Sequence, residues 1–221
     1  MPTKLVIIIG SPRLTRSSSY SIANYLKNGL STQDFSIDIL FSHKAIKDQS
    51  TVQDLLHKTK EADIIGIIFP LYVDSIPGPL IQILETIQDE QFMLIDKKIF
   101  TILNSGFPEP YHSDLALDMI KQFSTETQAE FIGGLTIGAG GMVGGMPIDQ
   151  IKNRIKRLVK ALDLTIQSLA ETQKIPDEAK QILSKPIFSK TLYNTFANLG
   201  WKHRAKKYGV KNLCLKPDKQ E

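Results

Sequence analysis

Five short apolar runs rich in Ile and Val recur along the first two thirds of this 221-residue chain, and a segment with helical periodicity follows each of them. Strands without polar alternation are typical of a parallel sheet that helices cover on both faces. The alternation therefore predicts a doubly wound α/β domain. The expected strands are 4–9, 35–41, 63–69, 98–104 and 131–139, and the expected helices are 18–30, 51–62, 79–90, 113–128 and 148–174.

The amino-acid composition excludes several classes of protein. The chain is 42% hydrophobic and 23% charged, which suits a folded domain with an ample core. No window approaches the roughly 18 consecutive apolar residues of a membrane span, and the first apolar run is too short for a signal peptide, so we expect a cytoplasmic protein. The single cysteine, Cys214, excludes an internal disulfide and a cysteine-held iron–sulfur or zinc site, and no metal site is expected.

Positive charge is concentrated at the C-terminus. Residues 1–174 carry 17 Lys and Arg against 19 Asp and Glu, whereas residues 175–221 carry 10 against 4. A nucleic-acid binder usually spreads positive charge over its main domain, so we expect no nucleic-acid partner. We place a domain at 1–174 and a basic helical extension at 175–221.

The loop after the first expected strand is rich in hydroxyl groups and arginines. A helix N-terminus offers unpaired N–H groups and the positive end of a dipole, so this loop is a candidate phosphate site. Neither G-x-G-x-x-G nor a P-loop is present, which favours a monophosphate. The alternative is that Ser17 or Ser18 only caps the helix and the arginines are solvated. The candidate residues are Ser11, Arg13, Ser17, Ser18 and Ser19.

The loops after the third and fourth strands offer flat surfaces. Tyr72 and Phe107 stand where a planar ring could pack, and Gly106 permits close approach of the backbone. His112 and Glu109 are possible proton donors, although a loop histidine is more often solvated, and we assign no catalytic residue.

A glycine-rich segment, 133–147, follows the fifth strand and holds seven of the 14 glycines. We interpret it either as a mobile loop near the mouth of the site or as a flexible connector without ligand contact.

Three motifs, "GSPR…SSS", "PLYVDSIPG" and "NSGFPE", stand in order after strands one, three and four. Together they resemble the NADPH-dependent FMN reductase group of flavodoxin-like proteins, over roughly residues 4–174. The resemblance implies a five-stranded parallel sheet in the order 2-1-3-4-5, with FMN at its carboxyl edge. The cysteine cluster of related iron–sulfur flavoproteins is absent, which excludes that branch.

The resemblance also implies an activity and its residues. The protein would be an FMN-dependent oxidoreductase that passes electrons from NADPH or NADH to a quinone, flavin or other small aromatic acceptor, as a homodimer or tetramer. Ser11, Arg13, Ser17, Ser18 and Ser19 would surround the FMN phosphate. The ring would lie between two further groups, Pro70, Leu71, Tyr72 and Val73 on one side and Asn104, Ser105, Gly106 and Phe107 on the other.

The extension reads as two helical pieces, 176–185 and 188–209. An apolar stripe runs through Phe188, Leu192, Phe196 and Leu199, and a basic cluster of Lys202, Arg204, Lys206 and Lys207 follows Trp201. We expect the stripe to pack on the domain or across a homodimer; contact with an anionic membrane is the less favoured alternative.

Two other functions stay open. A flavodoxin-type electron carrier would bind FMN without taking hydride from a nicotinamide, but such carriers usually have a strongly acidic face. A non-catalytic module with a flavin-binding fold would act through the basic tail, by binding a membrane or a partner.

Overall fold

The computed structural model describes residues 1–89, 94–186 and 190–209, and within the last helix it describes the side chains of Thr195 and of residues 198–209. The chain divides into two compact units, Met1–Ile187 and Phe188–Glu221. The predicted boundary at 174 lies within the first of these units.

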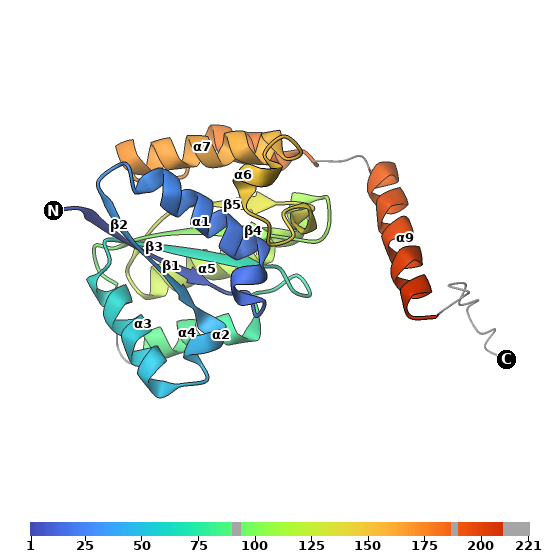
Figure 1. Ribbon diagram of the computed structural model, residues 1–221. Coiled ribbons are helices and arrows are strands. Elements are labelled where there is room, and N and C mark those ends of the chain that lie inside the picture. The colour runs from blue at the N-terminus through green and yellow to red at the C-terminus, as the bar shows by residue number, and fades with distance from the viewer. Residues whose placement is uncertain (90–93, 187–189, 210–221) are drawn as a thin grey trace. The chain divides into compact units, whose positions relative to one another are not determined.

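The first unit is built on a five-stranded sheet in the order β2-β1-β3-β4-β5, and every neighbouring pair is parallel. This confirms the predicted order and the flavodoxin-like class (Figure 1). The strands are β1 (Thr3–Ile9), β2 (Phe35–Phe41), β3 (Ile64–Pro70), β4 (Lys98–Asn104) and β5 (Glu130–Ile137).

Helices cover both faces of the sheet (Figure 1). On β1, Ile7 and Ile9 pack into one apolar cluster, and Val6 and Ile8 pack into the other, because successive side chains point to opposite faces. The first face carries α1 (Ser18–Leu30), α6 (Ile148–Ile151), α7 (Lys156–Glu171) and α8 (Asp177–Ser184). The second carries α2 (Ser42–Ala45), α3 (Gln49–Glu61), α4 (Gly78–Asp89) and α5 (Asp114–Glu126).

The last predicted helix of the domain, 148–174, is broken into α6 and α7. The Arg154 N–H donates to the Ile151 carbonyl at 2.8 Å, and Ile155 leaves helical geometry with φ −126° and ψ 36°. Ile151 and Ile155 are both buried. Residues four apart also share one face of an unbroken helix, so the burial of both isoleucines gives no sequence signal for the break.

Helix α8, which follows residue 174, belongs to the first unit. Ile175, Ala179 and Leu183 are buried in the same apolar cluster as α1 and α7. The Arg157 guanidinium donates to the carbonyls of Ile182, Lys185 and Pro186, which caps the C-terminal end of α8.

The second unit contains α9 (Lys190–Lys207). Of the predicted apolar stripe, Phe188 and the side chains of Leu192 and Phe196 lie outside the described residues, as does Cys214. Leu199 is exposed. Within the described ranges, no helix has the length and apolar character to cross a membrane.

Candidate functional site

A cavity of about 150 Å³ lies at the carboxyl edge of the sheet, where β1, β3 and β4 end. The strand order reverses between β1 and β3, the place where open α/β sheets bind ligands. Eleven of the thirteen predicted site residues line it, and Gly141 joins them. The lining is Ser11, Arg13, Ser17, Ser18, Ser19, Pro70, Leu71, Tyr72, Asn104, Ser105, Gly106 and Gly141.

The serine-rich turn leads directly into α1. The Ser17 hydroxyl oxygen accepts from the Tyr20 N–H at 3.1 Å and donates its proton to the Leu14 carbonyl at 2.6 Å. Ser17 is therefore the N-cap that the capping alternative proposed, and its side chain fixes where the helix begins.

The cap leaves other donors available. Neither the Ser18 nor the Ser19 backbone N–H has an acceptor within the described residues, as expected for the first turn of a helix. The Ser19 hydroxyl accepts from Asn104, so its own proton remains for donation, and the exposed Arg13 adds a guanidinium. Backbone N–H, hydroxyl and guanidinium donors at the positive end of a helix form a site for an anion.

Asn104 connects the strand ends that form the cavity. Its buried amide nitrogen donates to the Ser19 hydroxyl at 2.9 Å and to the Phe69 carbonyl at 3.0 Å. The backbone carbonyl of Asn104 accepts from the Leu71 N–H at 2.9 Å. One residue therefore ties β4 to the start of α1 and to the end of β3.

The glycine-rich segment packs closely against both sides of the cavity. The Ser18 hydroxyl donates to the Gly140 carbonyl at 2.9 Å, and the Gly140 N–H donates to the Ser105 carbonyl at 2.7 Å. Gly145 has φ +81°, and a Cβ there would lie 2.3 Å from the Arg16 carbonyl oxygen.

Gly140 and Gly145 therefore let this segment approach Asn104 and Arg16 more closely than a residue with a Cβ could. The close approach also brings in Gly141, which sequence reasoning missed as a site residue. The concentration of glycine was the signal for this contact, but nothing in the sequence specified the surface that the segment approaches.

Two predicted residues, Val73 and Phe107, lie outside the cavity lining. Tyr72 and Ser75 exchange N–H···O bonds of 3.1 Å each, which closes a two-residue turn with φ +51° at Val73 and +55° at Asp74. Val73 stands at the tip of this turn and is fully exposed, whereas Phe107 is half exposed and contacts a neighbouring loop residue. The sequence pattern placed both at strand ends but did not predict the turns that direct them away.

A family comparison agrees with this geometry. The model of the family described as NADPH-dependent FMN reductase matches residues 3–140, more than half of the chain. The chain belongs to the NADPH-dependent FMN reductase family. A search of curated proteins gives no match.

Solved structures place this FMN reductase family member in the same fold. An NADH:FMN oxidoreductase in its apo form is 20% identical, with 69% of this chain and 89% of that chain covered and a TM-score of 0.54. An NADPH-quinone reductase from P. pentosaceus is 17% identical, with 78% and 99% covered and a TM-score of 0.54. An FMN-dependent NADH-azoreductase from Bacillus anthracis, in complex with FMN, is 14% identical, with 76% and 100% covered and a TM-score of 0.52.

Family membership supports a general oxidoreductase role with FMN as cofactor. The donor set fits this cofactor: FMN ends in a phosphate monoester, and N–H and O–H donors at the start of α1, with Arg13 beside them, are the groups that bind one. The exposed ring of Tyr72 offers a flat surface on the same cavity.

His112, a proton donor considered from the sequence, lies among aromatic rings beside the cavity in this FMN reductase family member. Its ring centroid is 4.5 Å from that of Phe107 and 4.4 Å from that of Tyr111, and its Nδ1 is 3.6 Å from an Asp74 carboxylate oxygen. These contacts join the loop after β4 to the turn after β3. Neither His112 nor Glu109 lines the cavity.

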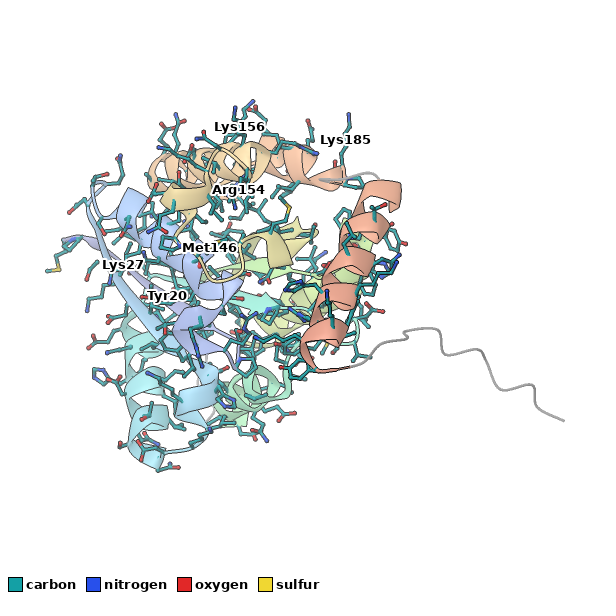
Figure 2. All side chains as sticks on the ribbon, turned by 45° about the vertical axis from the view of Figure 1, so that its right-hand side comes forward. Tyr20, Lys27, Met146, Arg154, Lys156 and Lys185 are labelled. Carbon is teal, nitrogen blue, oxygen red and sulfur yellow. The ribbon has the colours of Figure 1, made fainter. Side chains whose placement is uncertain are left out.

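Two larger hollows lie elsewhere on the first unit. One, of about 420 Å³ between α1 and α7, contains the Tyr25 hydroxyl, which donates to Asp163 at 2.7 Å; burial and this bond raise the pKa of Tyr25. The other, of about 580 Å³ on α7 and α8, includes Lys156 and Lys185, both labelled in Figure 2. Neither involves the strand ends, so size does not identify the site.

Proposed function

We propose that this protein is an FMN-dependent oxidoreductase that passes electrons from NADPH or NADH to a quinone, a flavin or another small aromatic acceptor. The observation that carries the proposal is the convergence of anion donors on one cavity at the strand ends. Membership of the FMN reductase family supplies the cofactor.

The chain's own residues would bind and orient. The N–H groups of Ser18 and Ser19 and the Ser11 and Ser19 hydroxyls would hold the phosphate, and Arg13 would add charge at the exposed side. Asn104 would keep the phosphate turn and the ring-facing loops in register through its two side-chain bonds.

When bound, FMN would accept hydride from a nicotinamide and pass electrons to the second substrate. Among the lining residues there is no histidine, aspartate or glutamate. The protein's role would therefore be to position the ring and to admit each substrate, without a side chain that acts as general acid.

The first test is a visible spectrum of the protein purified without added cofactor, followed by anaerobic NADPH. A flavin band that bleaches would support the proposal. A colourless protein that also fails to take up added FMN would contradict it.

Steady-state oxidation of NADPH and NADH with an added quinone then distinguishes a reductase from an electron carrier. Turnover is expected with at least one nicotinamide. A protein that binds FMN but shows essentially no turnover would be a flavodoxin-type carrier.

A further inference from the structure

The basic tail is the sequence feature that a flavin site does not explain. Between Glu178 and Asp218 the chain has nine Lys and Arg residues and no Asp or Glu. Such a run attracts an anionic partner and repels a cationic one.

Apolar side chains share one side of the chain at the end of α9, and Tyr208 continues the helical pattern because its N–H donates to the Arg204 carbonyl at 3.1 Å. Trp201, Ala205 and Tyr208 follow an i, i+4, i+7 spacing, which places them on one side of the helix. Trp201 is 62% exposed and Tyr208 is 80% exposed. We call these three residues the aromatic stripe.

Cations border the aromatic stripe on both sides. Lys202 and Lys206 follow it around one side of the helix, and Arg204 lies on the other side, 6.0 Å from the Trp201 ring centroid. Lys207 follows Arg204 around that second side, about as far from the stripe as Lys206 is on the first side. The described part of α9 contains no acidic residue that could neutralise these charges.

We propose that residues 201–208, the end of α9 and the residue that follows it, bind the surface of an anionic lipid bilayer. Trp and Tyr rings settle at the level of the lipid headgroups, with an apolar body and a polar tip. Lys and Arg at the flanks of a helix that lies in this plane reach the lipid phosphates. Rings with cations at their flanks suit a surface whose polarity changes with depth, because the rings reach the headgroup level while the cations reach the phosphates.

Sedimentation of the full chain with vesicles tests the proposal. At about 0.1 M salt, the protein should pellet with phosphatidylcholine vesicles that contain phosphatidylglycerol and stay in solution with pure phosphatidylcholine. Each lysine near the surface contributes about fivefold to partitioning, so the triple variant K202Q/K206Q/K207Q should bind about 100-fold more weakly. Trp201→Ala with Tyr208→Ala should also weaken binding to the anionic vesicles.

A matched variant removes the same charge from the first unit. Lys47, Lys60 and Lys121 are exposed there, and K47Q/K60Q/K121Q should leave vesicle binding unchanged. If the two triple variants lost vesicle binding equally, the attraction would depend on net charge alone, and the proposal would be overturned. Unchanged melting of the first unit in the α9 variants excludes misfolding as the cause of any loss.

Three further outcomes would also overturn it. The aromatic double variant could pellet to the same extent as the unmodified protein, which would show that the aromatic stripe has no role in binding. An oligonucleotide could bind where vesicles do not, which would indicate a nucleic-acid partner. Sedimentation velocity could show α9-dependent self-association without vesicle binding, which would assign the stripe to a second copy of the chain.

Discussion

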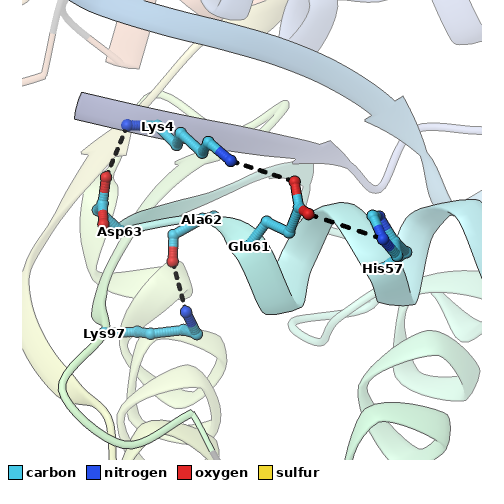
Figure 3. A network of polar contacts seen from close by, with 6 residues as sticks. All are labelled: Lys4, His57, Glu61, Ala62, Asp63 and Lys97. Carbon is cyan, nitrogen blue, oxygen red and sulfur yellow. Dashed lines mark hydrogen bonds and ion pairs between the residues drawn. The ribbon is translucent and has the colours of Figure 1, made fainter. Parts of the chain in front are cut away.

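Polar groups at the amino edge of the sheet bond to one another, whereas those at the carboxyl edge surround a cavity. At the amino edge, Lys4 donates from its backbone N–H to Asp63 at 2.8 Å and from its ammonium to Glu61 at 3.2 Å, and His57 lies 3.7 Å from Glu61 (Figure 3). Lys97 donates to the Ala62 carbonyl at 2.6 Å (Figure 3). At the carboxyl edge, hydroxyl and N–H donors surround a cavity.

The difference shows which edge can take a ligand. Charges at the amino edge satisfy each other, and burial lowers the pKa of Lys97 while Asp63 opposes that change. The carboxyl edge instead keeps first-turn donors without an acceptor within the described residues. A ligand there adds hydrogen bonds, whereas at the amino edge it would have to break them.

The largest effect is expected from Gly145→Ala at the carboxyl edge. The added methyl group would meet the Arg16 carbonyl oxygen, and φ +81° is strained for alanine. We expect a loss of about 3 kcal/mol in the free energy of unfolding and FMN binding at least about 100-fold weaker, because the phosphate turn must shift. Urea denaturation and FMN titration measure the two effects.

Gly78→Ala is the control for that variant, since nothing lies within 4 Å of the added methyl group. It should bind FMN normally. If Gly145→Ala also bound FMN normally, the close approach of the glycine-rich segment would have no part in shaping the site.

Asn104→Ala should have the next largest effect. It removes two side-chain hydrogen bonds and leaves the buried Ser19 hydroxyl and Phe69 carbonyl without that donor. We expect a loss of about 2–3 kcal/mol in stability together with weaker FMN binding, measured by thermal unfolding with and without FMN. Asn28→Ala, at an exposed position on α1, is the control. Loss of stability with unchanged FMN affinity would separate Asn104 from the site.

The sequence predicted the sheet well because buried parallel strands carry a strong apolar signal. Two strands, 35–41 and 98–104, and the helix 18–30 have the predicted bounds. The break between α6 and α7 was missed because Ile151 and Ile155 stand four residues apart and are both buried, as in an unbroken amphipathic helix.

The site was predictable to the extent that strand ends determine it. Motifs after β1, β3 and β4 meet because parallel strands place their carboxyl ends together. The positions of Val73, Phe107 and Gly141 depend on turns and on contacts between loops distant in sequence, which no local pattern encodes.

Arg13→Gln should weaken FMN binding by a smaller factor, about fivefold, because an exposed guanidinium contributes about 1 kcal/mol to an ion pair. The difference from the unmodified protein should shrink as salt is raised. Arg16→Gln is the control, since Arg16 is also exposed but does not line the cavity. Equal losses in both variants would indicate a general electrostatic effect of the turn instead of a contact with the phosphate.

The smallest effect is expected at the amino edge, from Glu61→Gln. The hydrogen bond and charge of Lys4 lower the pKa of Glu61, so its contribution to stability is present above the unfolded pKa, near 4.5, and is lost as pH falls through the folded pKa. The variant should melt slightly below the unmodified protein at neutral pH, and the two should converge in acid. Glu85→Gln, at an exposed position on α4, should show no such convergence. FMN affinity should not change in either variant; a change in Glu61→Gln would show that the two edges are coupled through the sheet.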